Sequence, residues 1–464
     1  MSSEVAVINT DALSAPNTFL PISSRLSISE MHSPHMTRLM AYQSEESLRV
    51  AFRRFGIAKN IDLMQATGEE QRAQLARFDK AYLPKDKHLE FIATLVGKTQ
   101  QVFHAKQFGD EEFRTYWHSN VDVMKGEALK PIPSCLSDIS GLGFCMHGPS
   151  LLGRTAMIQA LSDFMGPAFE VEGDHPAPKR MWVFPRLIIN FEKTRKGILR
   201  NFRYSILAEI GNARTKPQAL ATIERPDGEN VVIALCTLLN IGLIIIDGAG
   251  FLDVNGETAE IFAFLLKLRR HSGIPILFSG TSAFMHSVSF MGNMGSNLFN
   301  GDVLRFDVSR PPTINAETMQ PKGEWTSKCI WLWRQAFHDE PMPTQFPAWT
   351  YEAACGRDGW LAHGFHTLIK YVISKNGELP PQNLTDEDIK LAFNRRLELF
   401  DDARYAISQG AALAVTKGID KDKQAENRLT FIKHLDHMPL AMLSEGSFKT
   451  WTDSYMLNRL GRAA

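Results

Sequence analysis

Eight consecutive residues in the first half of the chain have the types and order of a phosphate-binding loop. The segment Gly148-Pro-Ser-Leu-Leu-Gly153-Arg154-Thr155 fits the pattern GxxxxG[KR][ST], with arginine where lysine is usual. In such a loop, backbone N–H groups converge on phosphate oxygens at a helix N-terminus, a cation reaches the outer phosphates, and a hydroxyl binds Mg²⁺. We therefore expect a nucleotide phosphate site formed by Gly148, Ser150, Gly153, Arg154 and Thr155, with Thr155 as a magnesium ligand.

Two polar residues at the ends of apolar strands extend this candidate site. Asp247 follows the apolar run Leu243-Ile-Ile-Ile, and a carboxylate at the end of a buried strand is suited to hold a nucleotide-bound Mg²⁺. Thr281 ends the segment IPILFSGT, where its hydroxyl could sense the γ-phosphate. We assign Asp247 to the cofactor and the metal, and Asp247 with Thr281 to catalysis. The alternative is that Asp247 only caps the following turn.

The elements that must position these residues alternate between strand and helix. Apolar strand patterns cover 143–146, 181–191, 242–248 and 274–281, and helical patterns cover 156–165, 196–210, 231–239 and 257–271. Strands separated by helices of this length predict βαβ units and a mostly parallel sheet. The fold class predicted is therefore α/β, with one α/β domain over about 140–310.

The flanking segments predict further regions. We expect a flexible N-terminal arm over 1–43, a helical N-terminal region over 44–130, the α/β nucleotide-binding core over 131–312, a helical lid over 313–409 and a partner-docking tail over 410–464. Within the lid, residues 313–348 are predicted to be irregular, with Trp325, Trp331 and Trp333 packing a subdomain junction. Thr385 is expected to cap the helix that follows it.

Composition narrows the class of protein. The 464 residues carry 51 Lys plus Arg and 51 Asp plus Glu, so net charge points to no particular partner. The five cysteines form no CxxC pair, which argues against a disulfide framework or structural zinc and favours a reducing cytoplasm. The longest apolar stretch, 231–252, contains Asn240 and Asp247, so no membrane span is expected.

Together these motifs resemble an AAA+ ATPase, and most closely the TnsC/TniB regulators of transposition. The resemblance covers about 85–400 and is carried by GFCMHGPSLLGRTAMIQAL, LIIIDGAGFL, IPILFSGTSAF, VLRFDVSRPP and LTDEDIKLAF. It implies ATP and Mg²⁺ as cofactors, homo-oligomeric rings or filaments on duplex DNA, and a link between a target-selection protein and transposase subunits.

Three departures from the family's pattern bear on hydrolysis. Arg154 replaces the lysine that reaches the β- and γ-phosphates, and a planar guanidinium is not an equivalent point charge. Gly248 stands where the family has the glutamate that positions water, although Asp253 or Glu257 could replace that base. No arginine precedes Leu304 in 297–303, which leaves Arg305 as the remaining candidate for the intersubunit arginine. We therefore expect weak or absent ATP hydrolysis.

A basic segment supplies the candidate DNA contact. Residues 192–203 contain five basic residues against one acidic residue, and a helix would place Lys196, Arg200 and Arg203 on a common face. Such a face suits contacts with DNA phosphates. The assigned residues are Lys193, Lys196, Arg200 and Arg203, with Thr215 and Lys216 as weaker candidates.

Other functions remain open from the sequence. A solvated helix face is the simplest alternative explanation of the basic segment. A nucleotide-independent scaffold, in which the AAA+-like fold is only an interaction platform, would explain the catalytic departures. A P-loop NTPase of defence or signalling is a further alternative.

Overall fold

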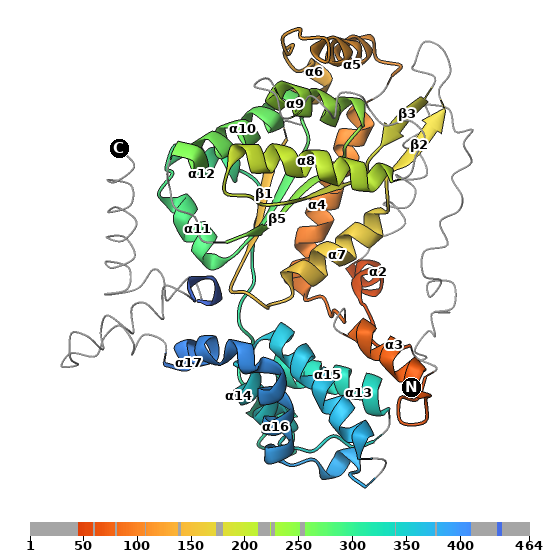
Figure 1. Ribbon diagram of the computed structural model, residues 1–464, viewed down its shortest axis with the longest axis vertical. Helices are drawn as coiled ribbons and strands as arrows, with labels where there is room; N and C mark the ends of the chain where they lie inside the picture. Colours follow the sequence, from red (N-terminus) through yellow and green to blue (C-terminus); the bar gives the residue numbers. More distant parts are fainter. Residues whose placement is uncertain are drawn as a thin grey trace, which may run out of the picture.

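The protein is described by a computed structural model that covers residues 45–58, 61–78, 81–106, 108–137, 141–172, 180–211, 223, 228–250, 256–338, 340–375, 378–409 and 434–438. These residues form a sheet domain and a helical domain that lie one above the other (Figure 1). The sheet domain contains the loop 148–155, and the helical domain contains the helices between residues 324 and 409.

The sheet domain is built on five parallel strands in the order β4-β5-β6-β1-β7. Their bounds are β1 Gly143–His147, β4 Leu187–Asn190, β5 Ile244–Ala249, β6 Ile276–Gly280 and β7 Val303–Arg305. The isoleucine run at the start of β5 is fully buried, as is typical of a parallel strand covered on both faces. The predicted α/β fold class, a P-loop type of parallel sheet with helical regions before and after it, is confirmed.

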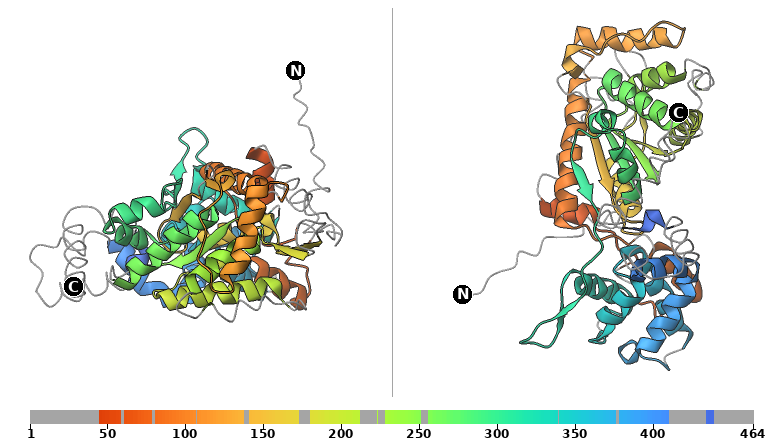
Figure 2. Two further views of the ribbon diagram at one scale, coloured as in Figure 1. Left: turned by 90° about the horizontal axis from the view of Figure 1, so that it is seen from above. Right: turned by 90° about the vertical axis from the view of Figure 1, so that its left-hand side faces the viewer.

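Helices cover both faces of this sheet. On one face α4 (Asp86–Ala105) and α7 (Arg154–Met165) pack against Phe144, Ile245 and Leu277. On the other face α8 (Arg195–Ile210), α9 (Gly228–Leu238) and α10 (Gly256–Ser272) pack against the neighbouring positions Cys145, Ile246 and Phe278. Figure 2 shows the sheet between these two helical layers. The alternation follows from the two-residue period of a strand.

Smaller elements complete the sheet domain. They are α2 (Glu45–Phe52), α5 (Glu111–Val123), α6 (Ser134–Ser137), α11 (Ser282–Ser289), α12 (Asn293–Leu298) and the antiparallel pair β2 (Phe169–Glu172) and β3 (Arg180–Val183). The prediction of one strand over 181–191 was wrong. Pro185 has no N–H to donate to a strand ladder, and the residues on its two sides join different sheets, with β3 pairing to β2 and β4 pairing to β5.

The helical domain has a tryptophan-rich core. Its elements are α13 (Glu324–Phe337), α14 (Phe346–Ala354), α15 (Asp358–Ser374), η3 (Pro381–Asn383), α16 (Asp386–Leu397), η4 (Glu398–Phe400) and α17 (Asp401–Gln409). The Thr385 hydroxyl accepts the Asp388 N–H at 3.3 Å, so the predicted cap of α16 is confirmed. α3 (Gly68–Phe78) joins this domain, where the rings of Phe78 and Phe365 stack 5.7 Å apart.

The expected irregular structure over 313–348 was wrong for much of that segment. It contains the short hairpin of β8 (Thr313–Ile314) and β9 (Pro321–Lys322), followed by α13. The three tryptophans lie on α13, with Trp325 and Trp333 buried in the core and Trp331 packed at its edge. Aromatic residues lower helix propensity, and here burial of their large apolar surfaces outweighs that preference.

Two general expectations can be compared with the described part of the chain. All five cysteines are free thiols, and burial raises the pKa of Cys145, Cys236 and Cys329 to about 12. Among the described helices, none is both long and apolar enough to cross a membrane.

Candidate phosphate-binding site

The predicted loop connects β1 to the N-terminus of α7. Gly148 lies so close to the strand exit at Phe306 that an added Cβ would be 2.4 Å from the Phe306 carbonyl oxygen. Gly153 has φ 88° and is the N-cap residue of α7. Both glycines of the motif therefore have a backbone reason to be glycine, one for close approach and one for a positive φ. The loop leads directly into the N-terminus of α7, and helix N-termini commonly bind anions.

The two residues after Gly153 differ in their surroundings. Arg154 is partly buried, and its Nε has no hydrogen-bond partner among the described residues. Burial lowers the pKa of the Arg154 guanidinium, while the charges of Asp247 and Asp436 act in the opposite direction. Thr155 is exposed on the first turn of α7. The loop thus combines an exposed threonine with a guanidinium that interacts electrostatically with Asp247 and Asp436.

Strand register brings the other predicted site residues to the same edge of the sheet. His147 of β1 pairs with Gly280 of β6, and Ala249 of β5 also pairs with Gly280. The loop follows His147 and Thr281 follows Gly280, while Asp247 lies within β5, two residues before Ala249. Ligands of open parallel sheets bind at this carboxyl edge, so these residues occupy a position suited to a ligand.

A β-bulge reshapes the end of β5 at the predicted carboxylate. Ile246 pairs with Phe278 and Ala249 with Gly280, so Asp247 and Gly248 together oppose a single residue of β6. Gly248 has φ 83°, a backbone conformation that residues other than glycine rarely adopt. The geometry of this bulge therefore favours glycine at 248, where the family that the sequence resembles has a glutamate.

A turn at residues 434–438 lies against the loop Gly148–Thr155. The 434–438 turn, which contains the short helix η5 (Leu435–His437), places the Asp436 carbonyl oxygen 2.9 Å from both the N–H and the hydroxyl of Ser150. The Thr281 hydroxyl donates to Asp436 Oδ1 at 2.5 Å and also accepts the Phe284 N–H, so it caps α11 as well. These contacts unite the loop, the β6 end and the 434–438 turn in one site.

The helical domain contributes Arg357, which the sequence reasoning did not assign. This arginine is fully buried at the start of α15 and donates to the Ser150 carbonyl oxygen at 2.6 Å and to the His437 carbonyl oxygen. Burial lowers the pKa of its guanidinium to about 10, and the group lies 5.0 Å from the centre of the Trp360 ring. In the sequence, Arg357 directly follows Gly356 at the start of a helix. No local sequence pattern, however, predicts that it lies beside Ser150.

The remaining catalytic candidates lie elsewhere. Arg305 is half-exposed and pairs with Asp307 at 2.7 Å. Glu257 is exposed in the first turn of α10, and Asp253 lies outside the described residues. Within the described residues, no hydrogen bond or ion pair joins Arg305 or Glu257 to the loop Gly148–Thr155.

The candidate DNA face lies on α8. Lys193, Lys196 and Arg200 are exposed and Arg203 is partly buried, while Ile198 and its neighbours pack inward on the sheet. Thr194 caps the helix by accepting the Gly197 N–H. Because β4 ends beside Asp247, the N-terminus of α8 begins at the same edge of the sheet as the phosphate loop. Thr215 and Lys216 lie outside the described residues.

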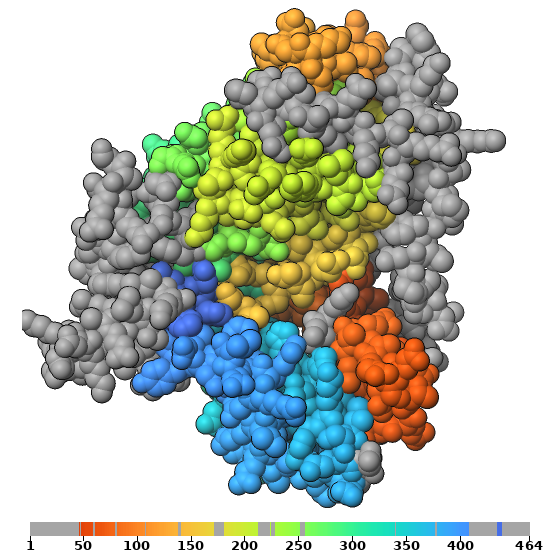
Figure 3. All heavy atoms as spheres, viewed as in Figure 1, coloured from red at the N-terminus to blue at the C-terminus, as the bar shows by residue number. Residues whose placement is uncertain are grey.

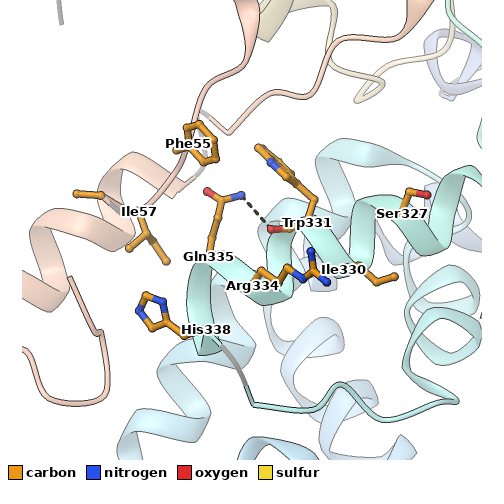
Figure 4. A pocket seen from close by; sticks show the side chains of 9 residues that line it. Phe55, Ile57, Ser327, Ile330, Trp331, Arg334, Gln335 and His338 are labelled. Carbon is orange, nitrogen blue, oxygen red and sulfur yellow. Dashed lines mark hydrogen bonds between the residues drawn. The ribbon is translucent and has the colours of Figure 1, made fainter. Parts of the chain in front are cut away.

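A separate cavity is not part of this site. It has a volume of about 470 Å³ and lies between α13 and the segment before α3 (Figure 4). Its lining residues are Phe55, Ile57, Ala58, Ser327, Ile330, Trp331, Arg334, Gln335 and His338. None of them belongs to the phosphate loop.

Comparison with known proteins finds similar solved structures, including the two below. No protein-family model and no curated protein matches the sequence. The ORC2 protein of Aeropyrum pernix, solved as ADPNP-ADP complexes, is 10% identical over 76% of this chain and 87% of its own, with a TM-score of 0.36. The Walker-type ATPase paby2304 of Pyrococcus abyssi is 11% identical over 71% of this chain and 91% of its own, also with a TM-score of 0.36.

Proposed function

We propose that the protein is an AAA+ regulator that binds ATP with Mg²⁺ in the loop Gly148–Thr155. One observation carries this proposal: the paired ends of β1, β5 and β6 gather the loop, Asp247 and Thr281 at the carboxyl edge of the sheet. The donors present, which are the loop amides, Arg154 and the Thr281 hydroxyl, suit an anionic phosphate chain. Thr155 and Asp247 supply the oxygen ligands that Mg²⁺ prefers.

ATP hydrolysis is expected to be weak or absent. Phosphoryl transfer depends on positioning and on charge stabilisation. The bulge glycine Gly248 offers no carboxylate to orient water, and Arg305 is engaged with Asp307. Bound Mg²⁺ would supply charge neutralisation at the phosphates, while the residues of this chain bind and orient the nucleotide.

Calorimetric titration with ATP, with and without Mg²⁺, tests nucleotide binding. Arg154→Ala removes the guanidinium from the loop and should weaken ATP binding by about 10-fold or more, as expected for the loss of a charge-assisted contact. Lys322→Ala, an exposed lysine on β9, is the control and should bind as the unaltered protein does. Absence of ATP binding in both the unaltered protein and the variant would refute the proposal.

We further propose that this regulator acts in DNA transposition. It would assemble as a homo-oligomeric ring or filament on duplex DNA and connect a target-selection protein to transposase subunits, as the family resemblance implies. The exposed basic residues of α8 support the DNA contact, because such a face binds phosphates independently of sequence. No contact with a membrane is proposed.

Duplex-DNA binding measured over a range of salt concentrations tests this second step. The double variant Lys196→Glu with Arg200→Glu should weaken binding and lower the salt slope by about 2, because each lost phosphate contact contributes about 0.9. Arg270→Glu with Lys322→Glu makes the same charge change on other exposed positions and should have a smaller effect. An unchanged slope in the α8 variant would show that DNA binds elsewhere.

A nucleotide-independent scaffold is a second candidate, favoured by a specific observation. The Ser150 N–H, a donor that a phosphate would need, already donates to the Asp436 carbonyl oxygen. If the 434–438 turn stayed there permanently, the fold would serve only as an interaction platform. A structure determined with ATP and Mg²⁺ distinguishes the two candidates: nucleotide in the loop supports the regulator, and an unchanged turn supports the scaffold.

A further inference from the structure

The 434–438 turn lies where the sheet domain meets the helical domain (Figure 3, dark blue), against the phosphate loop. We propose that this turn is an intramolecular inhibitor of the nucleotide site, in which Asp436 takes the place of phosphate oxygens and must leave before ATP binds. The inference rests on the proposed ATP-binding function and adds its regulation. It follows from three sets of contacts made by the turn.

The first contact uses the backbone donors of the loop. The Ser150 N–H and hydroxyl both donate to the Asp436 carbonyl oxygen, each at 2.9 Å. Amides of a phosphate loop bind phosphate oxygens in the same way. An N–H directed at Asp436 is not available to a phosphate, so the turn and the nucleotide compete for Ser150.

The second contact places a negative charge among the other anion-binding groups. Asp436 Oδ1 accepts the Thr281 hydroxyl, and Oδ2 would be 3.0 Å from a Cβ added at Gly250. The carboxylate also interacts electrostatically with Arg154. A carboxylate and a phosphate are both anionic oxygen acceptors. If both approached the same donors, their negative charges would repel each other. The carboxylate therefore excludes the phosphate electrostatically as well as sterically.

The third contact ties the turn to the helical domain. Arg357 donates to the carbonyl oxygens of Ser150 and His437, so one buried guanidinium joins the loop and the turn. The His437 and Trp360 rings stack 6.1 Å apart at an interplanar angle of 22°. Departure of the turn would remove these contacts and free one Arg357 nitrogen. Nucleotide binding is thus coupled to the contact between the two domains.

Competition of this kind lowers the apparent affinity for ATP, because only molecules with the turn released can bind. Titration of the full-length protein with a fluorescent ATP analogue and Mg²⁺ measures that affinity. Asp436→Asn removes the charge and keeps the backbone carbonyl, and should tighten binding by about 10-fold. Asp402→Asn, at an exposed position of α17, makes the same chemical change away from the loop and should leave the affinity unchanged.

Hydrogen exchange of the peptide that contains 434–438 is the second measurement. In the unaltered protein, saturating nucleotide should increase exchange in this peptide, because the turn is released. Equal affinities for the unaltered protein and Asp436→Asn, with exchange unchanged by bound nucleotide, would overturn the inhibitor and leave the ATP-binding function intact. No nucleotide binding by either protein would overturn both proposals.

Discussion

Lys106 provides a quantitative test of how burial controls the stability of the sheet domain. It lies at the end of α4, is fully buried, and its Nζ donates to the Ile241 carbonyl oxygen at 2.7 Å, just before β5. Burial lowers the pKa of the Lys106 ammonium from 10.5 to about 7, and nearby Cys236 acts in the opposite direction. The protein therefore folds more readily with this lysine neutral.

The sign and size of the effect follow from proton linkage. Between about pH 7 and pH 10.5 the unfolded chain binds more protons at Lys106 than the folded protein, so the free energy of unfolding rises with pH. From about pH 7 to about pH 8.5 this rise should be about 1.5 kcal/mol. The buried thiols of Cys145, Cys236 and Cys329 act in the opposite direction but only weakly in this range, because unfolded thiols titrate near 9.0 and the folded ones near 12.

Urea unfolding followed by circular dichroism at these two pH values provides the measurement. Lys106→Met keeps much of the side-chain volume and removes the titrating group, so the rise should be smaller by about 1.5 kcal/mol in this variant. Lys322→Met, at an exposed position, should retain the full rise. If the unaltered protein and Lys106→Met show the same pH dependence, Lys106 is not the group responsible and the reasoning fails.

Two further predictions concern the bulge and a buried histidine. Gly248→Ala should lower the free energy of unfolding by about 1 kcal/mol, because alanine is strained at φ 83° although there is open space for its Cβ. Urea unfolding measures this change. Gly256→Ala, in the first turn of α10, is the control and should lower the free energy of unfolding by less. His88 is buried, and burial followed by the charges of Lys85, Lys87 and Lys328 lowers its pKa to about 3, although Glu324 acts in the opposite direction. Since the unfolded histidine binds a proton below 6.5 and the folded one does not, stability should fall as the pH drops from 6.5 toward 3; a fall just as steep in His88→Gln would contradict this assignment.

The sequence predicted the elements that depend on local pattern. The isoleucine run of β5 indicated a buried parallel strand, and the glycines at 148 and 153 indicated the loop, because a positive φ and a close backbone approach both select glycine. Thr385 indicated a helix start, because a threonine side chain at the N-cap accepts a backbone N–H of the first turn. Local pattern was insufficient over 181–191 and 324–337, where pairing with β2 and burial of tryptophans decided the outcome.

The neighbours of the phosphate loop were decided only by the tertiary structure. Ser150 meets Arg357 and Asp436 across separations of 207 and 286 residues in the chain. Residue type and spacing determine dihedral preferences and which face of an element is apolar, and these showed that a phosphate loop should form. Which distant side chains then reach the loop depends on how the two domains pack, and that packing placed a guanidinium and a carboxylate beside Ser150 where the sequence had predicted only the loop, Asp247 and Thr281.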